Sequence, residues 1–572
     1  MKPASRKKLR FRASLLKTLC SNARLSRLDS VAPIRSRATD EGNIQIPLWS
    51  VPLVLIVLYV CLFSGLGAFG LVGPDEPRYA AIARAMAETH DWVTPRLWGT
   101  PWFEKPVLYY WAAGIAMRIF GVSEFAARLP SALAALLAVL AVAWTALRSY
   151  GVGAAWYALL MLPTSVAMIG FSRAASPDML FAGLLTAAMA VASEMLQKPR
   201  PGPILRIAFG FFLGAAVLAK GPAAVILAGG ATLLWAALSR QWRAPFRFLH
   251  PLVIAAFCAT ALPWYALCAL RNPDFLRVFI WQHNFERYLS PVFEHRQPLW
   301  FFGYVLFLAL IPWIWLFCLL CCDIGLYKTR MNSHHLLIGC WAAFTVLFFS
   351  LSQSKLPGYI LPAIPPLFVL LGCEVTRLLE RGGKGATWKM GGAGLLFLAF
   401  AAPLAKPALR TARVLHIANL RAIVAVLILT VVGGLCILVL SLLRQPKTAF
   451  IGIVLLMTVL VEIATAGILP QMDGLLSSRE LAKTILTYDR AAPSVTAYKL
   501  PRAWKYGLDY YMGREVREWT LTSPQPDWIV TTPEAALEIQ ENGVQIQEAN
   551  PISAPAIVVL HVLRPKEKQL LR

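Results

Sequence analysis

The sequence carries little charge for its length, and acidic residues are especially scarce. Charged residues make up 15% of the 572 positions against 58% hydrophobic residues, and the mean hydropathy is +0.59. This composition excludes a water-soluble chain of this length and indicates a membrane protein. The 30 acids against 55 bases leave a net charge of +25. Nucleic-acid binding does not explain this charge, because the bases lie mainly in an amino-terminal tail and in short loops between apolar runs.

Cysteine shows no pattern of paired or metal-binding residues. None of the ten cysteines falls after residue 436, and apart from Cys20 all lie in or beside apolar segments. We therefore predict no disulfide framework and no cysteine zinc motif. The tail, residues 1–46, also lacks the short apolar core and small-residue cleavage site of a signal peptide. It is interpreted as a basic cytoplasmic tail that rests on anionic lipid.

Thirteen apolar stretches approach the ~20 residues that a helix needs to cross ~30 Å of hydrocarbon. An odd number of spans places the two termini on opposite sides of the membrane. Because the tail and alternate loops are rich in lysine and arginine, the positive-inside rule puts the amino terminus in the cytoplasm. The predicted spans are 47–72, 126–147, 151–171, 177–196, 204–219, 221–238, 249–270, 300–322, 335–352, 356–374, 389–405, 421–443 and 448–469.

The chain changes character after residue 470, where it becomes polar and free of cysteine. Ser477 to Glu480 forms a capping-box pattern that predicts a helix to about Arg490. Strand-like runs at 494–500, 527–532 and 556–563, with a helical run at 533–542, follow it. The predicted architecture is thus a polytopic all-α membrane bundle over 47–470 and a small α/β domain over 471–572 on the outer, periplasmic side.

The first outer loop, 73–125, is the longest between spans and the richest in ionisable groups. Asp75 and Glu76 open an amphipathic helix expected to lie along the interface, and an aromatic helix runs from about 107 to 120. Each acid also has a purely structural explanation. Asp75 and Glu76 suit a helix start, Asp91 suits a turn, and Glu104 with Lys105 can be an exposed pair of little energetic consequence.

Several other ionisable residues fall at the outer ends of separate spans in this topology. Charges so close to hydrocarbon are costly and usually line a functional cavity, so their convergence with the first outer loop predicts one composite site. Lys355 and Tyr359 are one helical turn apart, a spacing that lets both face the same pocket. The converging residues are Arg128, Arg173, Asp178, Lys220, His283, Arg287 and Lys355.

These residues lie within motifs through which the sequence resembles the bacterial lipid A aminoarabinose transferases and, more distantly, the protein O-mannosyltransferases. Both are glycosyltransferases of the GT-C class, and the resemblance covers about residues 47–370. The matching motifs are Asp75-Glu76-Pro77-Arg78-Tyr79, Asp91-Trp92, Phe103-Glu104-Lys105-Pro106 with Tyr109-Tyr110-Trp111, Phe120-Gly121, Ala127-Arg128-Leu129-Pro130, Arg173 with Asp178, Ala219-Lys220-Gly221-Pro222, Asn284 with Arg287-Tyr288, Pro312-Trp313, and Ser354-Lys355-Leu356-Pro357 with Tyr359 and Leu361-Pro362.

The resemblance implies thirteen spans, two juxtamembrane helices, an outer carboxy-terminal domain and a site on the outer face of a bacterial inner membrane. It also implies an enzyme that takes a sugar from undecaprenyl phosphate or a similar polyprenyl-phosphate lipid, with no nucleotide at the site. The sugar stays open between aminoarabinose and a hexose, and the acceptor between lipid A, protein and glycan. The alternative from another class is a lipid or sugar transporter or flippase, which intramembrane charges also mark.

The resemblance and the chemistry together assign roles to individual residues. Transfer from a lipid phosphate needs cations where charge gathers on the leaving group, and a hydroxyl acceptor needs a base, for which Asp75 is the family's match. If the acceptor is already a phosphate, Asp75 would instead orient it or balance its charge. Glu76 and Asp178 are predicted as the other catalytic acids. The predicted ligands of the donor phosphate are Lys105, Arg287, Lys355 and Tyr359.

The resemblance also implies a divalent metal, expected to be zinc, held by Glu104 and His283. Such a pair holds zinc only with further ligands, such as water. A lone histidine has a structural explanation as well, as a hydrogen-bonding group. The metal is therefore an expectation that depends on finding more ligands nearby.

Overall fold

A computed structural model describes residues 50–286, 297–324, 333–414, 420–488, 495–548 and 557–563. All the described elements belong to one compact unit, Pro47–Arg572.

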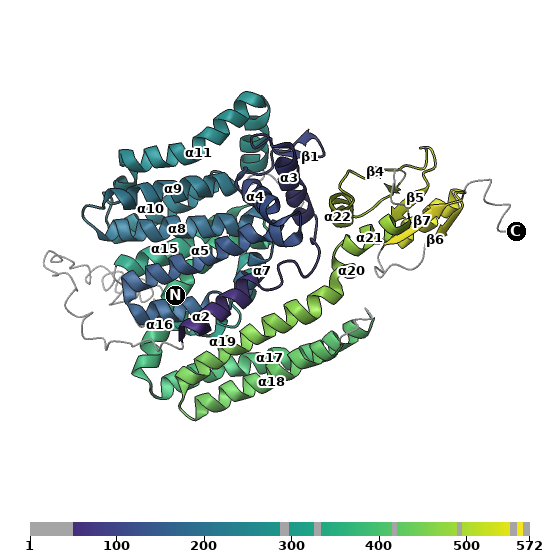
Figure 1. The fold of residues 1–572 in the computed structure, drawn as a ribbon. Coiled ribbons are helices and arrows are strands. Elements are labelled where there is room, and N and C mark those ends of the chain that lie inside the picture. The colour runs from purple at the N-terminus through teal and green to yellow at the C-terminus, as the bar shows by residue number, and fades with distance from the viewer. Residues whose placement is uncertain are drawn as a thin grey trace, which may run out of the picture. The chain divides into compact units, whose positions relative to one another are not determined.

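Long apolar helices form the body of this unit (Figure 1). Each of the thirteen apolar stretches overlaps a helix or a pair of helices. Within the described ranges, eight helices are long and apolar enough to span a membrane, or nine if a pair bent by 61° counts as one. The count of thirteen therefore stays a prediction. The helices of the bundle are α2 (Ser50–Leu58) with η1 (Tyr59–Phe63), α5 (Glu124–Tyr150), the bent pair α6 (Val152–Met161) and α7 (Val166–Ser172), α8 (Pro177–Gln197), α9 (Pro203–Lys220), α10 (Ala223–Ser239), α11 (Pro251–Arg271), α13 (Phe301–Ala309), α14 (Ile314–Ile324), α15 (Ser333–Leu351), η4 (Pro357–Ala363), α16 (Ile364–Arg381), α17 (Gly383–Val414), α18 (Leu420–Leu442) and α19 (Pro446–Ile463).

Breaks between successive helices put polar residues at helix ends. Gly221, with φ +93°, ends α9 just after Lys220, and Pro222 precedes α10. Pro177 opens α8 behind the capping residue Ser176, which places Asp178 in the first turn. Glycine and proline thus stop the apolar helices where the ionisable side chains begin.

The first outer loop folds into two helices at one end of the bundle (Figure 1). They are α3 (Asp75–Thr89) and α4 (Leu108–Phe120), joined through a hairpin of β1 (Arg96–Leu97) and β2 (Thr100–Pro101). Tyr79 of α3 packs against Tyr109 and Tyr110 of α4, with ring centroids 6.1 and 6.2 Å apart. Both predicted helices are confirmed, and α3 is largely buried by protein.

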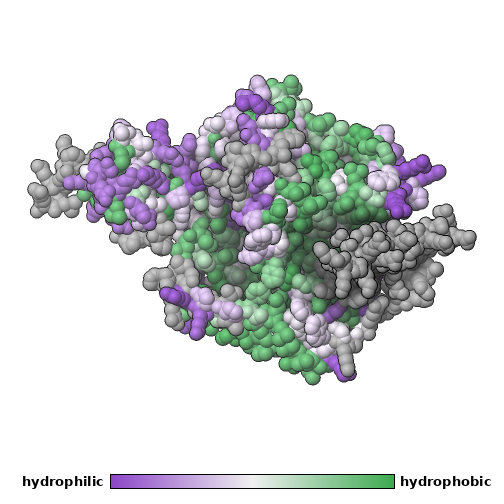
Figure 2. All heavy atoms as spheres, turned by 180° about the vertical axis from the view of Figure 1, so that it is seen from behind, coloured by the Kyte–Doolittle hydropathy of each residue, from purple (hydrophilic) through white to green (hydrophobic). Residues whose placement is uncertain are grey.

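The carboxy-terminal domain contains one five-stranded sheet in the order β4-β3-β5-β7-β6. Its surface is hydrophilic, in contrast to the hydrophobic face of the bundle (Figure 2). The three predicted strands and the helix at 533–542 are confirmed as β3, β5, β7 and α23, whereas α22, β4 and β6 were not predicted. The elements are α20 (Asp473–Leu476), α21 (Arg479–Tyr488), β3 (Val495–Ala497), α22 (Arg502–Met512), β4 (Arg517–Glu518), β5 (Trp528–Thr531), α23 (Pro533–Glu541), β6 (Ile546–Glu548) and β7 (Val558–Val562).

Candidate active site

Asp75 lies at the start of α3 and forms an ion pair with Arg78, one turn further on. Arg78 Nη2 lies 2.5 Å from Asp75 Oδ1 and 3.1 Å from Glu104 Oε2. The Asp75 side chain is 53% exposed, whereas that of Arg78 is 6% exposed. Burial alone would lower the pKa of Arg78, but the carboxylates of Glu104 and Asp75 raise it above its usual value. A fixed cation therefore sits beside a solvent-accessible carboxylate.

Buried donors around Arg78 have no protein partner among the described residues. They are Arg78 Nε, the indole nitrogen of Trp102 and the hydroxyl of Tyr110. Burial raises the pKa of Tyr110, and the nearby carboxylate of Glu104 adds to this effect, so the phenol stays protonated. Because buried polar groups are normally hydrogen-bonded, these donors indicate a place where a ligand or ordered water binds.

Glu76, the next acid in the chain, is held in a buried network instead. Its Oε2 accepts hydrogen bonds from Val72 N and Arg128 Nη2, both at 2.8 Å, and its Oε1 accepts from Ala175 N at 2.6 Å. Arg128 is fully buried. It also donates to the carbonyls of Leu66, Phe69 and Gly70 at 2.7–2.9 Å.

This network ties the start of α3 to α5 and to the segment before α8. Both oxygens of Glu76 already accept hydrogen bonds, so the geometry supports a positioning role. Arg173 has a similar environment, since its guanidinium donates to the carbonyls of Val60, Cys61, Ser64 and Ile169. The catalytic assignment of Glu76 stays a prediction.

Asp178 and Lys220 form a second pair of opposite charges, from the start of α8 and the end of α9. Asp178 Oδ1 and Lys220 Nζ form an ion pair. The ammonium group also lies 4.6 Å from the ring centroid of Tyr359. Gly358 leaves room for the carboxylate of Asp178, because a Cβ at residue 358 would lie 2.7 Å from Asp178 Oδ2. Lys220 is not among the residues predicted from the sequence to bind the phosphate, although it belongs to one of the motifs that carry the resemblance.

Lys355 and Tyr359 do not share a helical turn, so that prediction is wrong. Lys355 precedes η4, and its Nζ donates to the carbonyls of Gln297 and Ser352 at 3.0 and 2.7 Å. The ring of Tyr359 instead faces Lys220. The spacing rule failed because it assumes a continuous helix, and the helix begins only at Pro357.

The two predicted metal ligands, Glu104 and His283, line the same pocket of about 510 Å³. Zinc prefers four ligands. Over the described ranges, no group of three or more histidine, cysteine or acidic residues is placed to hold a metal. The fit is therefore incomplete, and zinc stays a prediction. Lys105 is half-buried next to Glu104, and Arg287 lies outside the residues that the structure describes.

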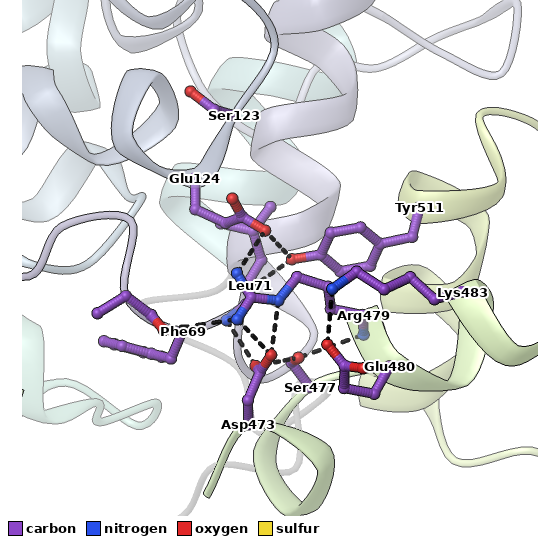
Figure 3. Close-up of polar contacts among 12 residues, drawn as sticks. Phe69, Leu71, Ser123, Glu124, Asp473, Ser477, Arg479, Glu480, Lys483 and Tyr511 are labelled. Carbon is purple, nitrogen blue, oxygen red and sulfur yellow. Dashed lines mark hydrogen bonds and ion pairs between the residues drawn. The ribbon is translucent and has the colours of Figure 1, made fainter. Parts of the chain in front are cut away.

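The carboxy-terminal domain contacts the outer loop through residues that sequence reasoning missed (Figure 3). Arg479 pairs with Asp473 at 2.5 Å and with Glu124 at 3.5 Å. The Tyr511 hydroxyl donates to Glu124 at 2.9 Å and accepts from Leu71 N at 2.8 Å. Periodicity in the sequence does not predict contacts between segments that are far apart in the chain.

Comparison with known proteins identifies similar chains over the same region. Residues 48–279 match the model of the dolichyl-phosphate-mannose-protein mannosyltransferase family. The undecaprenyl phosphate-alpha-4-amino-4-deoxy-L-arabinose arabinosyl transferase of Edwardsiella ictaluri is 33% identical over 59% of this chain and 61% of its own length. The enzyme of the same description from Aeromonas salmonicida is 31% identical over 62% and 66%. In these two alignments the chain spans just under two thirds of the relative.

A more distant relative and a solved structure extend over more of the chain. An arabinosyl transferase of the same description from Pseudomonas fluorescens is 28% identical over 82% of this chain and 88% of its own. The crystal structure of ArnT from Cupriavidus metallidurans bound to undecaprenyl phosphate superposes with a TM-score of 0.73. It is 24% identical and covers 90% of this chain and 97% of that one. This likeness establishes the fold.

Proposed function

We propose that the chain is a glycosyltransferase of the GT-C class, similar to the aminoarabinose transferases. It transfers a sugar from a polyprenyl-phosphate carrier to an acceptor. The arabinosyl transferase relatives favour aminoarabinose as the sugar and lipid A as the acceptor, with a hexose, protein or glycan as alternatives. The proposed donor carries its own activation, so no nucleotide is needed.

The observation that carries this proposal is an exposed acid beside a buried cation, at an end of the bundle that holds a second acid–cation pair. Asp75, Arg78 and Glu104 form the first group. Asp178 and Lys220 form the second. Glu76 connects them, because it accepts a hydrogen bond from Ala175, just before α8.

This arrangement supports a direct displacement at the anomeric carbon. The acceptor oxygen forms the new bond while the bond from the anomeric carbon to the phosphate oxygen breaks, and its electron pair stays on the phosphate. Asp75 takes the proton of a hydroxyl acceptor. Lys220 and Lys105 stabilise the charge that develops on the departing phosphate.

The remaining residues orient these groups. Arg78 holds the Asp75 carboxylate, and its unpartnered Nε donates to a substrate oxygen. Tyr359 confines the ammonium of Lys220 through its ring. Arg287 is a further proposed phosphate ligand. Lys355 contributes to the phosphate site through the backbone that its ammonium holds. Glu104 and His283 are the proposed ligands of a zinc ion, which would polarise a phosphate oxygen when bound, and no step above depends on it.

We also propose the orientation in a bacterial inner membrane, with the amino terminus cytoplasmic and the carboxy-terminal domain periplasmic. The cation-rich loops support it through the positive-inside rule. Single cysteines placed at 104 and 500 should then react with an impermeant maleimide added outside, while cysteines at 20 and 240 should not. Labelling of 240 and 500 from the same side would contradict this topology.

The proposed function is tested with purified protein and a polyprenyl-phosphate sugar labelled in the sugar. We expect the label to move to lipid A or another acceptor, with release of one free polyprenyl phosphate for each sugar transferred. A transporter or flippase would move the donor across a vesicle membrane and leave it intact, which would overturn the proposal.

A further inference from the structure

The guanidinium of Arg78 is surrounded by three aromatic rings. Its carbon lies 5.4 Å from the ring centroids of Tyr79 and Trp102, which belong to the first outer loop. The third ring, at 5.5 Å, is that of Tyr506 on α22 of the carboxy-terminal domain. All three distances are within the range of cation–π attraction. A residue of the soluble domain therefore contacts the cation that holds Asp75.

Helix α22 is fixed against the outer loop at more than this one point. Tyr510, one turn after Tyr506, is only 4% exposed and packs in the same apolar cluster as Tyr79. The hydroxyl of Tyr511 bonds to Glu124 and to the backbone of Leu71 (Figure 3). Residues spaced by four on a helix share a face. The face of α22 that carries Tyr506 is thus the face packed on the outer loop.

The aromatic rings also keep the Arg78 guanidinium away from water. Its shortest contacts to Asp75 and Glu104 are both made by Nη2, and Nε has no protein partner among the described residues. Three rings within about 6 Å lower the local dielectric and add cation–π attraction, which strengthens the attraction of Arg78 to the two carboxylates.

We propose that Tyr506 is a positioning residue for the transfer reaction and that α22 forms one wall of the active site. The ring of Tyr506 holds Arg78 in the orientation that aligns Asp75 and Glu104. This inference rests on the proposed function for its catalytic meaning. The contact between Tyr506 and Arg78 is testable without it.

The activity test compares changes of the same ring. Tyr506→Leu keeps an apolar side chain but removes the π system, and we expect turnover to fall roughly tenfold with little change in KM for the donor. Tyr506→Phe keeps the ring and should retain at least about half of the wild-type turnover. Arg502→Ala is the matched control, since Arg502 is exposed and contacts the same ring at 5.9 Å. It should leave turnover unchanged.

A thermal double-mutant cycle of Arg78→Met and Tyr506→Leu is the readout that does not need activity. We expect coupling: the double variant should lose no more thermal stability than the less stable single variant. Additive losses in the cycle would overturn the Tyr506–Arg78 contact. Equal turnover of the Leu and Phe variants would overturn the positioning role. Absence of transfer by the wild type would instead refute the proposed function, and the cycle would still decide whether the contact exists.

Discussion

Asp75 and Glu76 are neighbours in the chain, yet the regions around them differ in almost every physical respect. Asp75 is half exposed and has one described ion pair. Glu76 accepts hydrogen bonds on both oxygens, and its partner Arg128 is fully buried. Charges gathered at one end of a membrane bundle therefore serve two purposes. Some hydrogen-bond to the backbone and hold it in place, and others stay accessible to substrate.

The contrast predicts that the largest loss of activity comes from Asp75→Asn. This change is nearly isosteric and removes only charge and basicity. We expect turnover to fall by ~10²–10⁴-fold, the range typical of a lost general base, while the protein stays monodisperse with a wild-type melting temperature. Near-normal turnover with a hydroxyl acceptor would contradict the assignment of Asp75 as the base.

Glu76→Gln should lower the stability of the fold instead of acting mainly on the reaction. The change leaves the buried guanidinium of Arg128 without its counter-charge, which typically costs ~3–5 kcal/mol of unfolding free energy. Thermal unfolding in detergent measures this. The control is Glu88→Gln, because Glu88 pairs with Arg84 on an exposed surface and such pairs contribute ~0–1 kcal/mol. A stable but inactive Glu76 variant would show that Glu76 has a direct catalytic role.

Lys220 and Lys355 should differ in the same way, one affecting mainly turnover and the other mainly stability. Lys220→Met should lower turnover by roughly 10²-fold, because it removes a cation from the proposed phosphate site. Lys355→Met should mainly lower the melting temperature, since the ammonium of Lys355 bonds to backbone carbonyls. A donor titration on both variants separates the effects. Equal turnover losses at equal stability would remove the distinction.

Lys105→Ala and Arg287→Ala should each weaken use of the donor by about tenfold, and also weaken its competition by free polyprenyl phosphate. A phosphate at the edge of hydrocarbon lies where the effective dielectric is low, so a fixed cation contributes more than an exposed one. Lys384→Ala, near the start of α17 on the side predicted to be cytoplasmic, is the control. If the Lys105 and Arg287 variants used the donor as well as the Lys384 variant across the titration, Lys105 and Arg287 would not be phosphate ligands.

A smaller, pH-dependent effect is expected where Tyr511 joins the carboxy-terminal domain to the bundle. Burial raises the pKa of Tyr511, and the charge of Glu124 adds to this. The folded state therefore favours the protonated phenol, so its stabilising effect is complete below the unfolded pKa of about 10 and declines as pH rises above it. The stability difference between wild type and Tyr511→Phe should shrink above pH ~10. A constant difference would contradict this.

Much of the fold followed from local patterns, whereas most of the site did not. Apolar length located the membrane helices, the residues at Asp75 located the start of α3, and a helical run at 533–542 located α23. The pairing of Asp178 with Lys220, and of Arg78 with Tyr506, depends on segments that are distant in the chain. Periodicity contains no such information. The wrong prediction for Lys355 and Tyr359 has another cause, because a helical spacing was applied across the break that precedes Pro357.

We propose that the donor phosphate binds at the outer end of the bundle, and photocrosslinking with a photoreactive polyprenyl phosphate can locate it. We expect crosslinks near residues 102–110 and 218–221, reduced by Lys220→Met and by excess undecaprenyl phosphate. The opposite end offers an apolar groove of about 420 Å³ lined by Trp242, Phe246 and Leu249. Crosslinks confined to that groove and competed by undecaprenyl phosphate would contradict a donor site at the outer end.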